Sequence, residues 1–239
     1  MAGKETIQMR SLLITSCAVL TLYAAIPLIA EDEGSKETTK RVRESALVLN
    51  EIMSAGDKGI PEDLLQKAEC VGIVPNLKRA GFVIGGQYGK GVLTCRTNGH
   101  KGWSAVSTVR IEGGSVGFQI GAGETDLVFI VMNESGMNRL TKDKFTFGAD
   151  ASVMAGPLGR AADARTDASL KAEILAWSRS RGVFAGISLE GATLRPDAED
   201  NAKMYGHAVT QEELLHGHVK TAEFMEPLFA ELNRWAPYK

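Results

Sequence analysis

The chain has 239 residues, with 27 Lys and Arg against 29 Asp and Glu, so its formal net charge is only −2. This length suffices to bury one large core, and the balanced charge, without a long basic block, excludes a general attraction to nucleic acid. Its 26 glycines follow no collagen-type period, which indicates many turns and close backbone contacts.

The N-terminal segment has the pattern of an export signal. Lys4 and Arg10 precede an apolar run over residues 11–30, and acidic residues begin at Glu31. A basic start, an apolar stretch and a polar mature start are typical of a signal peptide, although a run of this length also suits an uncleaved anchor. Residues 1–30 are therefore expected to direct export to the periplasm, the cell envelope or the outside of the cell.

Two helices are expected before the β-rich part of the chain. Residues 31–40 are charged and polar, which suggests a short flexible lead. Apolar residues at helical spacing predict a helix over 35–55, and Pro61 opens a second helix over 61–69.

Residues 71–195 alternate short Val-, Ile- and Phe-rich runs with glycines. Glu112-Gly113-Gly114 and Arg181-Gly182 have the composition of hairpin turns, and residues 134–141 suit a short helix. Many short strands with short connections predict an α+β fold, a mainly antiparallel β barrel or sandwich flanked by N- and C-terminal helices. The expected strands are 71–75, 80–88, 91–96, 103–111, 114–122, 125–132, 145–154, 173–180 and 182–190.

The C-terminal part returns to helical patterns. A helix is expected over 197–205 and ends at Gly206, while Thr210 and Glu213 have the spacing of a capping box. An apolar stripe predicts a last helix near 221–235, with Pro227 in its first turn. We divide the chain into a leader (1–30), a flexible lead (31–40), one domain (41–206) and a helical extension (207–239).

Three motifs suggest phosphate binding, catalysis or metal binding but fit structural explanations better. The glycine-rich segment 81–91 lacks the Gly-Lys-Ser/Thr ending of a phosphate loop, because Lys90 is followed by glycine. Ser115 lies in a Gly-x-Ser-x-Gly pattern at the start of an expected strand, whereas a nucleophile elbow joins a strand to a helix. His216 and His218 suggest a metal site, yet no cysteine lies near them.

Acidic residues leave a second, weaker enzymatic alternative. Asp126, Asp150 and Glu190 are candidates for paired acid–base catalysis, but the sequence gives no sign that any two lie together. Cys70 and Cys95 are the cysteines that remain beyond residue 30. They form either a disulfide, which an oxidising compartment permits, or two buried thiols.

Basic residues recur through the early strands and turns, where one face or rim of a sheet gathers them. Such a surface attracts anionic lipid headgroups. The full set is Lys78, Arg79, Lys90, Arg96, Lys101 and Arg110. From it we take Lys78, Arg79, Lys90 and Arg96 as the predicted lipid contacts.

A series of short motifs runs in order from residue 41 to residue 206. None is specific alone, because glycine-hydrophobic strings are common, but their order over this length is. The motifs are Ile60-Pro61, Ile73-Val74-Pro75, Ala80-Gly81-Phe82, Gly85-Gly86, Gly89-Lys90-Gly91-Val92, Trp103-Ser104, residues 114–122 with Asp126, Gly148-Ala149-Asp150, residues 155–160, residues 178–191, Asn201 and Tyr205-Gly206.

This order of motifs resembles the SYLF domain family, a group of lipid-binding domains. The family includes fungal actin-bundling and animal phosphoinositide-binding proteins, and its bacterial members are mostly exported. The resemblance implies lipid binding without catalysis, but it assigns no contact residues. No cofactor and no metal are predicted.

The predicted function is therefore non-enzymatic binding of anionic phospholipid at the cell envelope or outside the cell. A protein-interaction module that bundles filaments or forms a scaffold is the alternative, and a hydrolase is the third possibility. The predicted partner is a membrane surface, with no nucleic acid and with any protein partner unidentified.

Overall fold

The computed structural model describes residues 33–56, 59–81, 84–97, 99–116, 121–156, 172–180, 182–185 and 189–237. The predicted leader lies outside the described residues, as do parts of the motif series, including residues 117–120 and 157–171. Within the described part of the chain, none of the helices is long and apolar enough to span a bilayer.

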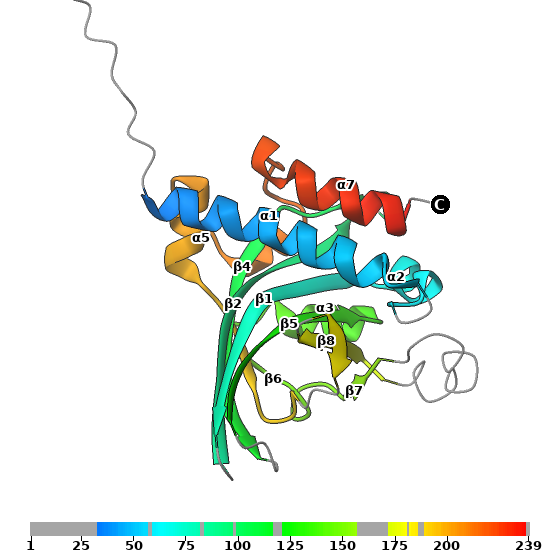
Figure 1. Cartoon of the computed structure of the whole chain (residues 1–239). Coiled ribbons are helices and arrows are strands. Elements are labelled where there is room, and N and C mark those ends of the chain that lie inside the picture. The colour runs from blue at the N-terminus through cyan, green and yellow to red at the C-terminus, as the bar shows by residue number, and fades with distance from the viewer. Residues whose placement is uncertain are drawn as a thin grey trace, which may run out of the picture. The chain divides into compact units, whose positions relative to one another are not determined.

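Helices occupy both ends of the described chain (Figure 1). The first helix begins at Glu33, so residues 33–40 are helical rather than a flexible lead. A 3-10 turn, η2 (Glu223–Met225), leads into the last helix. The helices are α1 (Glu33–Met53), α2 (Glu62–Lys67), α3 (Glu134–Leu140), α5 (Ala198–Tyr205), α6 (Gln211–Leu215) and α7 (Glu226–Trp235).

The predicted helix signals act as expected. Gly206 ends α5 in a left-handed conformation with φ 74°. Thr210 and Glu213 form a complete capping box at α6, and a proline occupies the first turn of α7.

The β-rich part forms one sheet that curls into an open half-barrel (Figure 1). Its strands follow the order β6-β10-β4-β2-β1-β5-β8-β7, with β3 beside β2 and β9 beside β8. The strands are β1 (Cys70–Gly81), β2 (Ile84–Thr97), β3 (Gly102–Trp103), β4 (Ser107–Val116), β5 (Gly121–Val131), β6 (Phe145–Thr146), β7 (Val153–Ala155), β8 (Ile174–Ser180), β9 (Val183–Ala185) and β10 (Thr193–Pro196).

The expected α+β class is confirmed, but the barrel or sandwich is not. The path through the sheet starts and ends on different strands, so the described strands do not close into a barrel. The sheet is also mixed, because β7 pairs with β8 in parallel while the other pairs of described strands are antiparallel.

Two turn predictions had different outcomes. Ser180 pairs with Val183, which confirms the hairpin expected between them, although Arg181 is outside the described residues. Gly113, by contrast, continues strand β4. A side chain there would place its Cβ 2.9 Å from the Cα of Ala192, so the glycine allows two backbones to approach closely instead of making a turn.

Each face of the sheet carries its own apolar core. The helix face packs against α1, α2 and α7 through residues such as Val71, Ile73 and Ile130. The opposite face packs Leu77, Phe129 and their neighbours against α3 and β6. Leu214, Leu228 and Leu232 of the C-terminal segment are buried in the helix-face core, so residues 207–237 are part of the domain's packing.

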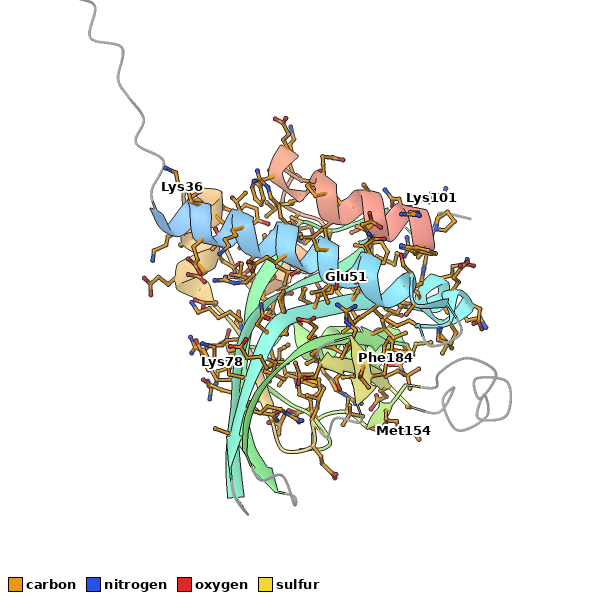
Figure 2. All side chains as sticks on the ribbon, in the orientation of Figure 1. Lys36, Glu51, Lys78, Lys101, Met154 and Phe184 are labelled. Carbon is orange, nitrogen blue, oxygen red and sulfur yellow. A yellow bond between two sulfur atoms is a disulfide. The ribbon has the colours of Figure 1, made fainter. Side chains whose placement is uncertain are left out.

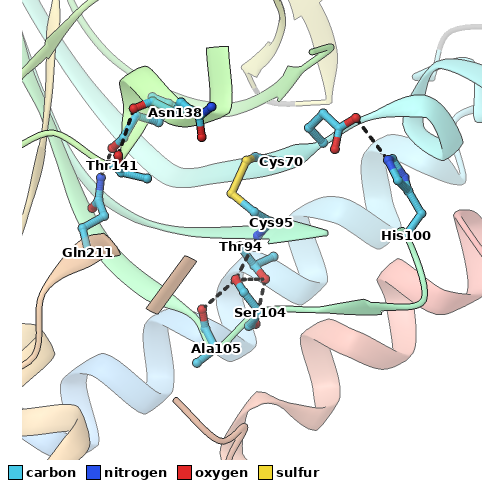
Figure 3. Close-up of a disulfide and its surroundings, with 11 residues drawn as sticks. Cys70, Thr94, Cys95, His100, Ser104, Ala105, Asn138, Thr141 and Gln211 are labelled. Atoms are coloured by element: carbon cyan, nitrogen blue, oxygen red, sulfur yellow. Dashed lines mark hydrogen bonds and ion pairs between the residues drawn. A yellow bond between two sulfur atoms is a disulfide. The ribbon is translucent and has the colours of Figure 1, made fainter. Parts of the chain in front are cut away.

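A disulfide joins Cys70 of β1 to Cys95 of β2, which are paired in register (Figure 3). The sequence left two alternatives, a disulfide or two buried thiols, and the structure contains the disulfide. Both cysteines are fully buried in the opposite-face core. Beside the bond, His100 contacts Glu69 across 3.1 Å (Figure 3).

Candidate functional site

Antiparallel pairing aligns basic side chains from four strands on the helix face of the sheet. Lys90 of β2 pairs with Arg110 of β4, and Arg110 pairs with Arg195 of β10. Two residues along β2, Tyr88 lies on the same face and pairs with Lys78 of β1. We call Lys78, Tyr88, Lys90, Arg110 and Arg195 the basic face.

The basic face is open to solvent. Lys78 is exposed, Tyr88 keeps 46% of its surface accessible, and the two arginine side chains are more than a third exposed. Arg195 and Arg110 share the carboxylate of Glu112, at 2.9 Å and 3.6 Å from their Nε atoms. In Figure 2, Lys78 lies beside the strands, below α1 in this view.

Lys90 links the basic face to the helices. Its Nζ lies 2.8 Å from Asp197 and 2.9 Å from Asp200, and Asp200 also accepts a hydrogen bond of 2.8 Å from Arg41 of α1. Burial opposes ionisation of Asp200, but the hydrogen bonds from Lys90 and Arg41 win and lower the pKa of its carboxyl. Lys90 therefore has a structural role beside any role at the surface.

The structure brings together only two of the four predicted lipid contacts, Lys78 and Lys90. Arg79 follows Lys78 on the strand and so points to the opposite face, where it donates to Gln87 across 3.4 Å and where burial lowers its pKa. Arg96 is only 5% exposed. Its guanidinium lies 3.8 Å from the centre of the Trp103 ring and donates to the carbonyl of Ala236.

Arg195 is the one positively charged residue of the basic face that the sequence did not indicate. It lies on a short strand that has no alternating pattern, and it is 85 positions from Arg110 in the chain, counting 195 minus 110. Only the pairing of β10 with β4 reveals that the two are neighbours.

A hollow of about 1210 Å³ lies next to the basic face, at the ends of β1, β2, β5 and β8. Lys78 and Tyr88 belong to both features. Within it, Asp126 accepts from the backbone N–H of Asn76 at 3.1 Å and lies 3.4 Å from Arg179. Its lining residues are Asn76, Lys78, Arg79, Ala80, Gly86, Gln87, Tyr88, Gly123, Glu124, Thr125, Asp126, Arg179 and Ser180.

Arg179 connects the hollow to the first helix. Its guanidinium contacts Glu51 of α1 as well as Asp126 of β5. This double contact holds Asp126 in an ion pair and leaves Glu124 as the other carboxylate of the hollow.

The enzymatic alternatives find little support in the geometry. Ser115 lies within β4, paired with Gly85, and not at a strand-to-helix elbow. Asp150 accepts from the backbone N–H of Thr146 and so serves a local turn. His216 and His218 have ring centres 6.3 Å apart, and the described residues contain no group of three side chains suited to a metal.

Comparison with known proteins identifies relatives over most of the chain. A family model described as "Las17-binding protein actin regulator" (Ysc84) matches residues 112–235. The match continues through α6 and α7, beyond Gly206, where the series of sequence motifs ends.

Two of the similar proteins illustrate the match, and both are eukaryotic and longer than this chain. "LAS seventeen-binding protein 3" of Saccharomyces cerevisiae is 35% identical over 211 residues, which cover 87% of this chain and 45% of the yeast protein. "SH3 domain-containing YSC84-like protein 1" of Rattus norvegicus is 32% identical over 200 residues, covering 83% and 58%. The chain thus spans about half the length of the curated relatives it matches.

Proposed function

The chain belongs to the Ysc84 (SYLF) family, and from this premise we propose that it is a non-enzymatic binding protein that attaches to anionic phospholipid surfaces through its basic face. The observation that carries this proposal is the alignment of Lys78, Arg110 and Arg195 with the exposed Tyr88 on one face of the sheet. Lys and Arg attract anionic headgroups within a Debye length, and an exposed tyrosine suits the headgroup region.

The proposed location is the cell envelope or the outside of the cell. In this proposal, residues 1–30 act as the export signal. The disulfide between Cys70 and Cys95 supports it, because such bonds persist in oxidising compartments and are rare in the cytosol.

Vesicle co-sedimentation tests the function. The chain should bind vesicles that contain phosphatidylglycerol and should not bind pure phosphatidylcholine. The double variant Lys78→Gln/Arg195→Gln should bind the anionic vesicles roughly thirtyfold more weakly, because each basic residue near an anionic surface contributes about 1 kcal/mol.

A matched double variant controls for net charge. Lys67→Gln/Arg234→Gln removes the same charge from exposed side chains on α2 and α7, away from the basic face. It should bind like the unmodified chain. Equal losses for the two double variants, or equal binding to neutral and anionic vesicles, would refute the proposed role of the basic face.

A protein-interaction module is the second candidate. The observation that favours it is the description of the relatives, which names Las17 binding and actin regulation. Co-sedimentation with filamentous actin in the absence of lipid separates the two candidates. Pelleting with filaments together with no retention on anionic vesicles would favour this second function.

A further inference from the structure

Two side chains of opposite charge face the hollow without pairing to each other. Lys78 of β1 and Glu124 of β5 are direct cross-strand partners, and both are exposed and line the hollow. Within the described part of the chain, neither side chain forms an ion pair or a hydrogen bond. An ammonium group and a carboxylate are therefore available side by side.

The neighbouring charges are already engaged. Asp126 contacts Arg179 and the backbone of Asn76. Lys90 is held by Asp197 and Asp200, and Arg110 and Arg195 share Glu112. Among the described side chains that line the hollow on the helix face of the sheet, the charges left for a ligand are thus one positive and one negative group, which does not suit a ligand of a single sign.

The sheet surface beside Lys78 and Glu124 carries small residues. Ala80 of β1 pairs with Gly86 of β2, and a Cβ placed on Gly86 would meet no atom within 4 Å. Tyr88, two residues further along β2, lies on the same face as Gly86 and places an aromatic ring beside Lys78. A small polar group can therefore lie on the sheet between these side chains.

We infer that the hollow binds a phosphate ester that carries a primary ammonium group, as in phosphoethanolamine or phosphoserine. The phosphate lies toward Lys78 and the ammonium group toward Glu124. This inference rests on the proposed function, because it names the headgroup class that the same surface selects.

Calorimetric titration with soluble compounds tests the inference without a membrane. O-phosphoethanolamine should bind about tenfold more tightly than sn-glycerol 3-phosphate, because only the former offers an ammonium group to Glu124. In Glu124→Gln this preference should disappear. Equal affinity of the unmodified chain for the two compounds would overturn the inference, and so would a preference that persists in Glu124→Gln.

A pair of glycine variants tests the place of binding. Gly86→Tyr fills the hollow and should abolish binding of O-phosphoethanolamine. Gly114→Tyr is the control, because Gly114 pairs with Gly86 and does not line the hollow, and a Cβ placed on it would meet only the Gly85 carbonyl oxygen, at 3.8 Å. Unchanged binding in Gly86→Tyr would contradict the assignment.

Vesicles distinguish a lipid headgroup from a free phosphate ester and separate the two proposals. Selective binding of O-phosphoethanolamine without retention on vesicles, whether these carry phosphatidylglycerol, phosphatidylserine or phosphatidylethanolamine, would refute the proposed function and identify a soluble ligand. Retention on anionic vesicles without any preference for the ammonium-bearing compound would refute the inference and leave the proposed function intact.

Discussion

Arg96 is a charged side chain held inside the fold by contacts of different kinds. Its guanidinium stacks on the Trp103 ring at 3.8 Å and donates a 2.8 Å hydrogen bond to the carbonyl of Ala236, the residue that caps α7. A cation at the C-terminal end of a helix also complements the helix dipole. The residue therefore fixes the last helix to β2 instead of facing a membrane.

Replacing Arg96 with alanine should lower the free energy of unfolding by about 3 kcal/mol, because it removes a buried charge-assisted hydrogen bond and a cation–π contact. Urea denaturation measures the change. Arg234→Ala is the control, since Arg234 lies 4.8 Å over Trp235 with its side chain 60% exposed, and it should cost less than about 1 kcal/mol. Similar losses in the two variants would show that the burial of Arg96 contributes nothing.

The sequence shows which residues are basic, but it does not show which face of the sheet each of them occupies. Lys78 and Arg79 are adjacent and look equivalent in the sequence, yet strand alternation sends them to opposite faces. Which of the two faces solvent depends on the register of β1 with its neighbours. Arg195 joins the basic face through a pairing between segments far apart in the chain, which no local pattern reveals.

At the scale of elements, one buried and one half-buried ion pair connect α1, β2 and the start of α5. Arg41, Lys90 and Asp200 come from these three elements and meet at the Asp200 carboxylate. The lowered pKa of Asp200 means that the folded chain binds its proton less readily than the unfolded chain does. Its contribution to stability is complete above the unfolded pKa of about 4 and is lost as the pH falls through the folded value.

The variant Asp200→Asn should therefore destabilise the chain by about 2 kcal/mol at pH 7, since Arg41 and Lys90 lose a charged partner. Below pH 4 the difference from the unmodified chain should shrink as Asp200 becomes protonated. Denaturation measured across pH 3–7 tests this. Glu199→Gln, in an exposed pair with Lys203, should have almost no effect, and a pH-independent loss in Asp200→Asn would contradict the ion-pair explanation.

Local signals predicted the helices more accurately than the strands. The capping box at Thr210 and the stop at Gly206 depend on a few neighbouring residues, and they are found as expected. The residues Glu112-Gly113-Gly114 suit a turn, and the sequence therefore predicts one at Gly113. Its actual role is to let β4 approach Ala192, a residue 79 positions later, counting 192 minus 113, and such a contact is invisible in a local pattern.

At the scale of the whole molecule, the two cores are covered by different kinds of element. The helix-face core is covered by helices from both ends of the chain, whereas the opposite-face core is covered by short segments such as α3 and β6. The Cys70–Cys95 bond lies in the second core and joins two central strands. A covalent link there restrains the unfolded chain across a sequence separation of 25 residues.

Removing this bond should destabilise the whole domain, because strands β1 and β2 contribute side chains to both cores. A loop of this size is worth roughly 3 kcal/mol, which for a domain of this length corresponds to a fall in Tm of about 6–12 °C. The variant Cys70→Ala/Cys95→Ala measures the effect by thermal unfolding. A reducing agent should lower the Tm of the unmodified chain and leave that of the double variant unchanged. If the reductant lowered both equally, or neither, the bond would not be the source of the stability, and its support for an oxidising location would be lost with it.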